Sequence, residues 1–228
     1  NKKTNLFHSN VSHYELMRDL NRQWRQWTID EPAVFITFNG MAYDEELVRR
    51  QFYWNLFESY LTNTNGNGRL DILLMMNNVA AFSPDVLNIP LFNGGPGVSL
   101  KQADIAEANG IEIGDAHDAI ADCKLMISLL EKINAKKPEL IDFFLSISTK
   151  PGVQAAVQQS GFLGLGEVFR REIFKYPVVP CGSKAPNDLM FFDLSFDPDE
   201  VFEMDTQEIY SLVQKPSKSG PFKKYGIN

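Results

Sequence analysis

Hydrophobic residues recur at intervals of three and four positions along much of the chain, a spacing that is typical of amphipathic helices. The first such stretch has Leu16, Leu20, Trp24 and Trp27 on one predicted face. The pattern predicts helices at residues 12–27, 45–57, 71–81, 99–109, 115–134, 138–148 and 206–213. Most of the chain up to residue 150 is therefore expected to be helical.

A different pattern predicts strands. Ala33–Phe38 is a short apolar run bounded by Pro32 and Asn39, as expected for a buried strand. After Lys150 the pattern changes to short β-like runs at 168–174, 176–181 and 189–194. We therefore expect two domains, an α/β domain at 1–149 and a small β-rich domain at 150–228.

The helix that begins near Asp115 has an interrupted apolar stripe. Its apolar members are Ala119, Met126, Leu129 and Ile133, and Asp122 takes the position of a missing member. An ionised carboxylate on a buried face costs on the order of several kcal/mol unless a partner neutralises it. A metal ion is one such partner, and His117, five residues earlier, is then a candidate general base.

A second candidate carboxylate, Asp44, follows the predicted strand, where ligand sites of α/β sheets gather. Two carboxylates meeting there, Asp44 and Asp122, would hold Mg²⁺ or Mn²⁺ through oxygen. Phosphodiester cleavage commonly uses two such ions about 4 Å apart, with a base of near-neutral pKa. Simpler interpretations remain open: Asp44 as a helix N-cap, His117 as a capping or loop residue, and Asp118 as solvated charge in a first helical turn.

Composition narrows the possible classes of protein. The chain has 228 residues, 44% of them hydrophobic, which is sufficient for a core and argues against disorder. Its net charge of −7 disfavours nucleic-acid binding by overall charge, but not binding at a local groove or through metal ions. No apolar run reaches the ~18 residues of a membrane span, and no signal-peptide pattern is present. Cys123 and Cys181 match no metal-ligand spacing and favour a reducing compartment.

Several motifs occur together in a characteristic order. They are Phe38–Asp44, Asn63–Asn67, Arg69–Asp71, Ala108–Glu112 and Asp115–Asp122. This order and spacing resembles bacterial exonuclease I, a family of histidine-type four-carboxylate 3′–5′ exonucleases with a ribonuclease-H-like fold. The resemblance covers essentially the whole chain, since Phe191–Leu194 and the acidic stretch after it look like the SH3-like domain of that family.

The resemblance implies a role for each candidate residue. Asp44 would be the third and Asp122 the fourth of four metal-binding carboxylates, and His117 would deprotonate the attacking water. Asn39 would support the terminal nucleotide. The implied reaction removes 5′-mononucleotides from a free 3′ end of single-stranded DNA, with two Mg²⁺ (or Mn²⁺) ions. The implied protein is cytoplasmic and monomeric when complete, has no membrane association, and has single-stranded-DNA-binding protein as a possible partner.

The chain also departs from the family pattern. The first two carboxylates of the family form an Asp-x-Glu on the first strand of the sheet, and no such strand precedes Ala33 here. Asp30 and Glu31 are adjacent and are followed by Pro32. We therefore interpret the chain as an internal fragment that is inactive by itself. It would comprise a partial ribonuclease-H-like exonuclease domain and an SH3-like domain.

Two alternative functions remain open from the sequence. The first is a non-catalytic module from a degenerate exonuclease that binds single-stranded nucleic acid. Its candidate phosphate contacts, each also explained as solvated charge, are Arg18, Arg22, Arg25, Lys215, Lys218, Lys223 and Lys224. The second is a related exonuclease that acts on short RNA, which the SH3-like segment disfavours.

Overall fold

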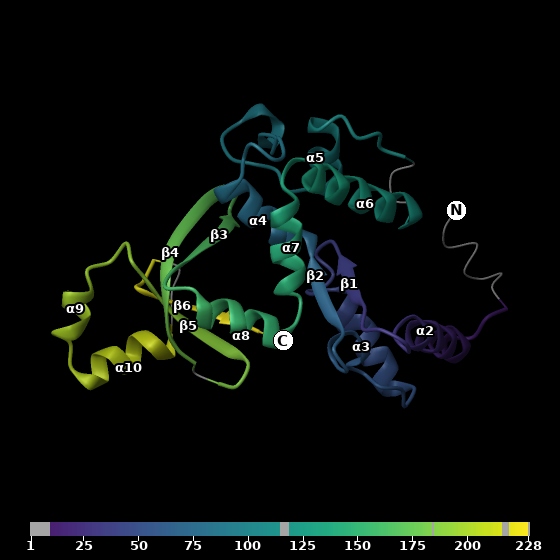
Figure 1. The fold of residues 1–228 in the computed structure, drawn as a ribbon, viewed down its shortest axis with the longest axis horizontal. Coiled ribbons are helices and arrows are strands. Elements are labelled where there is room, and N and C mark those ends of the chain that lie inside the picture. The colour runs from purple at the N-terminus through teal and green to yellow at the C-terminus, as the bar shows by residue number, and fades with distance from the viewer. Residues whose placement is uncertain (1–9, 115–118, 184, 216–218, 228) are drawn as a thin grey trace. The chain divides into compact units, whose positions relative to one another are not determined.

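The computed structural model describes residues 10–114, 119–183, 185–215 and 219–227, and the chain divides into two compact units, 1–71 and 72–228 (Figure 1). The first unit contains α2 (His13–Trp27), β1 (Val34–Thr37), α3 (Asp44–Trp54), η1 (Leu61–Asn63) and β2 (Gly68–Asp71). The predicted boundary between two domains near residue 150 stays a prediction.

The predicted helix at 12–27 is confirmed as α2. Ser12 and Glu15 form a capping box, in which the Ser12 hydroxyl accepts a hydrogen bond from the Glu15 amide and the Glu15 carboxylate accepts one from the Ser12 amide. The predicted apolar face is wrong at its ends, since Leu16 is 54% and Trp27 is 61% exposed. Met17 is buried instead, because the helix packs through Trp24 onto aromatic rings of its own unit.

The first unit is built on a two-stranded parallel sheet. The predicted strand is confirmed as β1, and it pairs with β2 so that Thr37 lies opposite Asp71 at the carboxyl end of both strands. The strand β2 was not predicted, because its four residues carry no alternation that separates them from the preceding loop. Asn67 joins the two strands: its side chain accepts from the Ala33 amide at 2.9 Å.

The second unit contains seven α-helices, one 3₁₀ turn and four strands among the described residues. They are α4 (Ile72–Phe82), η2 (Phe92–Gly94), α5 (Gln102–Ala108), α6 (Ala119–Lys136), α7 (Pro138–Ser146), α8 (Lys150–Gln159), β3 (Leu163–Phe169), β4 (Glu172–Gly182), β5 (Asp188–Asp193), α9 (Pro198–Phe202), α10 (Thr206–Gln214) and β6 (Phe222–Gly226), where η2 is a single 3₁₀ turn. Within the described ranges, no helix combines the length and the apolar character that a bilayer crossing requires.

The change of pattern at Lys150 marks the start of a helix that was not predicted. Thr149 caps α8, and its hydroxyl accepts a hydrogen bond from the Gly152 amide. Pro151 lies in the first turn of α8, where the missing amide hydrogen costs nothing because that hydrogen has no partner within the helix.

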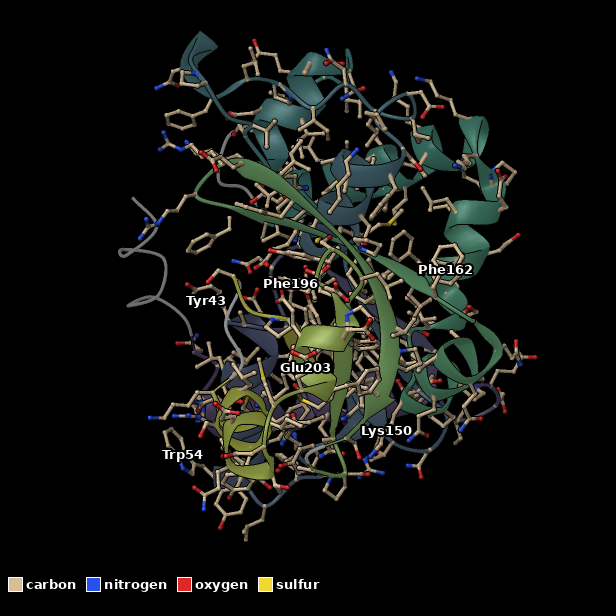
Figure 2. All side chains as sticks on the ribbon, turned by 90° about the vertical axis from the view of Figure 1, so that its left-hand side faces the viewer. Tyr43, Trp54, Lys150, Phe162, Phe196 and Glu203 are labelled. Atoms are coloured by element: carbon tan, nitrogen blue, oxygen red, sulfur yellow. The ribbon has the colours of Figure 1, made fainter. Side chains whose placement is uncertain are left out.

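The four strands of the second unit form one antiparallel sheet in the order β3–β4–β5–β6. The predicted runs at 176–181 and 189–194 are confirmed as parts of β4 and β5. The predicted run at 168–174 is wrong, because it contains the turn between β3 and β4, and most of β3 and all of β6 were not predicted. Figure 1 shows helices α8 and α10 beside the sheet. Both faces of the sheet are covered, since Val157 of α8 packs on one cluster of core side chains and Leu212 of α10 packs on another. The first cluster is Tyr176, Val178 and Phe191, and the second is Met190, Phe192 and Phe222. Phe196, which is labelled in Figure 2, packs against the second cluster.

The outer strand β3 is closed off by α4. The side chain of Asn78 accepts from the Gly166 amide at 3.0 Å, and that of Asn77 accepts from the Val168 amide at 2.9 Å. A Cβ at Gly166 would lie 2.7 Å from the Ala81 Cβ, so only glycine permits this approach. Helix α4 thereby satisfies amides that would otherwise form an open sheet edge.

In contrast, β1 is paired along one edge only. No other described strand hydrogen-bonds to it, and Ile36 on this strand is 37% exposed. Because unpaired strand edges recruit further strands, we expect the chain to self-associate, with a mean mass in sedimentation equilibrium that rises with protein concentration.

A lysine at this edge should oppose the association. We expect Ile36→Lys to reduce the concentration dependence, whereas Ile29→Lys, at a position that is 78% exposed and outside the strand, should leave it unchanged. A monomer with a single two-state unfolding transition at all concentrations would contradict this expectation.

Candidate active site

The loop between β1 and α3 is held by a buried carboxylate. The Asp71 side chain, at the end of β2, accepts hydrogen bonds from the Asn39 amide at 2.7 Å and from the Met41 amide at 3.2 Å. Both amides belong to the segment that leads from the strand into the helix. A charged acceptor forms stronger hydrogen bonds than a neutral one, so Asp71 fixes the path of this loop.

Asn39 and Gly40 are residue types that suit the backbone conformation of this loop. Asn39 has a φ of 61°, a left-handed conformation that asparagine tolerates better than most residues. A Cβ at Gly40 would lie 2.4 Å from the Thr37 Cβ, so this position excludes a side chain. The motif Asn39–Gly40 is therefore explained locally by backbone geometry, and the predicted role of Asn39 at a substrate stays a prediction.

Asp44 is the first residue of α3. It is not the N-cap, because Tyr43 occupies that position and no side chain caps the helix. The Asp44 side chain is exposed, and it forms no hydrogen bond or ion pair with any described residue. A carboxylate in the first turn is favoured by the helix dipole, and this one remains available for a ligand.

The two acidic residues that follow Asp44 are already paired. Glu45 forms an ion pair with Arg69 of β2 at 2.7 Å, and both side chains are largely buried. Glu46 pairs with Arg50 at 2.7 Å and also with Arg49 on the same helix. Of the three carboxylates in the first turn, Asp44 alone is free of a described partner, which singles it out as the candidate ligand.

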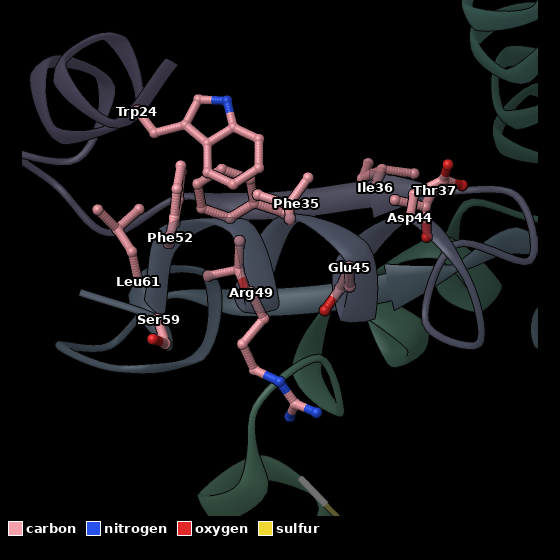
Figure 3. A pocket seen from close by; sticks show the side chains of 12 residues that line it. Trp24, Phe35, Ile36, Thr37, Asp44, Glu45, Arg49, Phe52, Ser59 and Leu61 are labelled. Atoms are coloured by element: carbon pink, nitrogen blue, oxygen red, sulfur yellow. The ribbon is translucent and has the colours of Figure 1, made fainter. Parts of the chain in front are cut away.

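A pocket of about 190 Å³ lies beside Asp44 within the first unit. Figure 3 shows Trp24, Phe35 and Phe52 gathered at one end, with Thr37 and Asp44 together at the other. The Thr37 hydroxyl is buried and has no hydrogen-bond partner among the described residues. The pocket is thus apolar over most of its wall and polar at the end where β1 meets α3.

Asp122 lies in the second unit, in the first turn of α6. The prediction that Asp122 is buried is wrong, since the residue is exposed. The buried stripe of α6 is Leu125, Leu129 and Ile133, and Asp122 continues this stripe at a spacing of three, but at the end of the helix where no described residue covers it. Its carboxylate, like that of Asp44, forms no hydrogen bond or ion pair with a described residue.

The remaining candidate is His117, which lies outside the described residues, as does Asp118. Among the residues that the structure describes, no three His, Cys, Asp or Glu side chains gather into a possible metal site. Asp44 and Asp122 offer the oxygen ligands that Mg²⁺ and Mn²⁺ prefer, but one carboxylate in each unit is fewer than such an ion needs.

Known proteins show what these features are similar to. No family model matches the chain. Over 207 residues it is 32% identical to exodeoxyribonuclease I of Haemophilus influenzae, an alignment that covers 84% of this chain and 43% of that protein. It is also 34% identical over 116 residues to exodeoxyribonuclease I of Buchnera aphidicola, covering 50% of this chain and 28% of the relative. The chain is exonuclease I-like.

Solved structures agree on the fold of this exonuclease I-like chain. Exonuclease I of E. coli in complex with a dT13 oligonucleotide has a TM-score of 0.74 at 22% identity, over 97% of this chain and 49% of that one. Exonuclease I from Methylocaldum szegediense has a TM-score of 0.76 at 22% identity, over 97% and 49%. The mixed α/β fold is therefore that of exonuclease I structures. The exonuclease I-like chain spans less than half the length of the curated relatives it matches.

Asp71 is the residue whose role the sequence did not reveal. Its motif, Arg69–Asp71, is part of the resemblance to exonuclease I, but the periodicity of the sequence gives no reason to expect a buried carboxylate that binds the backbone of another segment. The same holds for the Glu45–Arg69 pair, whose members are 24 positions apart.

The loop geometry leads to a prediction about stability. Asp71→Asn leaves one acceptor oxygen and no charge for two partly buried amides, so we expect the free energy of unfolding in urea to fall by about 1–3 kcal/mol. Asp122→Asn is the matched control, and at this exposed position it should change the value by less than about 0.5 kcal/mol. Equal effects of the two substitutions would show that Asp71 does not hold the loop.

Proposed function

We propose that the complete protein is a 3′–5′ exodeoxyribonuclease that degrades single-stranded DNA to 5′-mononucleotides by metal-dependent hydrolysis. This chain supplies the third and fourth metal-binding carboxylates, Asp44 and Asp122, and the general base, His117. The observation that carries the proposal is the exposed, unpaired carboxylate of Asp44 at the carboxyl end of a parallel strand, in a chain that is exonuclease I-like.

Similar structures support the choice of substrate and partner. Among them are E. coli exonuclease I in complex with dT13 and with dA16 oligonucleotides, and an ExoI/SSB-Ct complex. By analogy, we propose single-stranded DNA with a free 3′ end and the single-stranded-DNA-binding protein as partners of the complete protein. A zinc-ion-bound form of an E. coli ExoI–ssDNA complex also supports a divalent cation as cofactor.

The cofactor that we propose is a pair of Mg²⁺ or Mn²⁺ ions. Such ions supply Lewis-acid stabilisation of the charge that develops on the phosphate and leaving oxygens. Asp44 and Asp122 fit as metal ligands because each is exposed and its carboxylate forms no hydrogen bond or ion pair with a described residue. The remaining ligands in the family pattern are the Asp-x-Glu pair, which residues 1–33 do not contain.

The roles of the protein side chains follow from their chemistry. His117 would take a proton from the attacking water, since imidazole titrates near neutral pH. Asn39 would position the terminal nucleotide from the loop that Asp71 holds. The Glu45–Arg69 ion pair fixes α3 to β2 and so keeps Asp44 at the end of the strand.

We further propose that the parallel pair β1–β2 and its helices are part of a ribonuclease-H-like domain, and that the antiparallel sheet β3–β6 is the SH3-like domain of the family. A cytoplasmic, monomeric complete protein fits this assignment. The alternative function, a non-catalytic module that binds single strands, is favoured for this chain alone, because its described residues gather no three potential metal ligands.

The chain alone should not hydrolyse DNA. Because each unit has only one candidate metal-binding carboxylate among its described residues, we expect Mg²⁺-dependent digestion of a 3′-labelled single strand to stay at the rate of a buffer control. Clear release of labelled mononucleotide from the purified 228-residue chain would contradict the assignment of an incomplete site.

In the complete protein, each proposed residue can be tested separately. We expect Asp44→Ala and Asp122→Ala to abolish cleavage and His117→Ala to slow it by about 10²–10⁴-fold, while single-strand binding stays within about twofold. Glu46→Ala, which removes a carboxylate paired on the surface of the same helix, is the control and should retain activity. If Asp122→Ala weakens binding as much as cleavage, Asp122 is a structural residue.

A further inference from the structure

The cations that the sequence offered as phosphate contacts are mostly neutralised. Arg18 and Arg22 both pair with Asp19, at 3.0 and 2.7 Å, and Arg25 pairs with Glu58 at 3.0 Å. Lys223 is buried beside Asp193, and Lys224 lies 3.3 Å from Asp188. A cation that already has a carboxylate partner is a poor candidate for an exposed phosphate site.

A different set of cations in the second unit is unpaired. We use the term basic tip for Arg170 and Arg171, at the turn between β3 and β4, together with Lys101 beside them. All three are exposed, and none forms an ion pair with a described residue. Glu172, the next residue in the chain, does not pair with either arginine.

The turn of the basic tip is held in a strained conformation. Phe169 pairs with Glu172 across the hairpin, so Arg170 and Arg171 are the two turn residues, with φ values of 50° and 72°. Two-residue turns of this kind prefer Asn-Gly, since a left-handed backbone is unfavourable for a residue with a long side chain. Backbone strain of this type is found at ligand-binding sites, so the guanidinium groups of Arg170 and Arg171 are candidate ligand contacts.

A loop braces the tip in this conformation. The Val98 amide donates to the Arg171 carbonyl at 2.8 Å, and a Cβ at Gly97 would lie 2.7 Å from the Arg171 Cβ. The Arg171 guanidinium lies 3.3 Å from the centre of the Phe92 ring, and the Lys101 ammonium lies 5.8 Å from the same ring. The positions of Arg171 and Lys101 are therefore set by a shared aromatic ring.

The second arginine also has an aromatic neighbour. The Arg170 guanidinium lies 5.3 Å from the centre of the Phe169 ring, which is itself partly exposed. Guanidinium groups bind phosphate through two parallel hydrogen bonds, and exposed aromatic rings stack on unpaired bases. Cations beside an exposed ring, which at this turn is Phe169, are the composition expected of a surface that binds a single strand.

We propose that the basic tip binds the phosphate backbone of single-stranded DNA, with Arg170 and Arg171 as the phosphate contacts. The choice of single-stranded DNA rests on the proposed function, whereas the site rests on the unpaired cations, the strained turn and the rings. The negative charge of the chain as a whole makes such a local concentration of unpaired cations necessary for binding a polyanion.

The test replaces the two arginines by the residues that the turn itself prefers. Arg170→Asn combined with Arg171→Gly should weaken binding of fluorescein-labelled (dT)30 at least about tenfold at 0.1 M NaCl, measured by fluorescence anisotropy. The plot of log affinity against log salt should become shallower by about 1.4, since each lost phosphate contact removes about 0.7. The thermal midpoint should not fall, because this turn relieves the strain.

The matched control removes the same charge elsewhere. Arg18→Gln combined with Arg22→Gln takes two cations from α2 that are already paired with Asp19, and binding should change by less than about twofold. Equal losses in the two double variants, or unchanged binding in the tip variant, would overturn the proposal. Equally strong binding of the unsubstituted chain to a blunt duplex would overturn the assignment to single strands.

These outcomes are independent of the proposed catalysis. A tip variant that loses binding supports the basic tip even if Asp44→Ala leaves cleavage by the complete protein intact. Loss of cleavage in Asp44→Ala supports the catalytic assignment even if the tip variant binds normally. If the unsubstituted chain fails to bind (dT)30 at low salt, the basic tip is not a binding site.

Discussion

The buried carboxylate of Asp71 is the interaction on which the candidate site depends. Parallel pairing of β1 and β2 places it opposite Thr37, and from there it accepts hydrogen bonds from the Asn39 and Met41 amides. These bonds give the loop one path, and that path delivers Asp44 to the start of α3. Without these bonds two partly buried amides would be unpaired, and this cost would favour another loop conformation and move Asp44 away from the strand end.

Two sets of charged groups can be distinguished, one buried and paired and the other exposed and unpaired. Buried or half-buried ions have partners: Glu45 has Arg69, and Lys223 has Asp193. The carboxylates of Asp44 and Asp122 and the cations of the basic tip are exposed and unpaired in the described part of the chain. This division follows from desolvation, because a charge without a partner is tolerated only where water, an ion or a ligand can reach it.

Local sequence patterns predicted where helices and strands lie better than they predicted which side of each helix is buried. The apolar periodicity at 12–27 and the apolar run at 33–38 identified α2 and β1, because both patterns are encoded within neighbouring residues. The buried face of α2 was misjudged, and so was the burial of Asp122, since both depend on which neighbours cover a helix and how far along it they reach. The strand β2 and the helix α8 were missed because neither has a strong periodicity of its own.

The sequence by itself determined most of the helices, the strand that precedes Asp44, and the order of motifs that is exonuclease I-like. These features are local, or are preserved as spacing along the chain. Only the tertiary structure decided that Asp71 binds a loop some 30 residues away, that Asp44 is free while Glu45 is paired, and that two adjacent arginines form a braced turn. Hydrogen bonds and ion pairs between distant residues exist only after folding has brought their partners within about 3 Å, and no periodicity in the sequence records that distance.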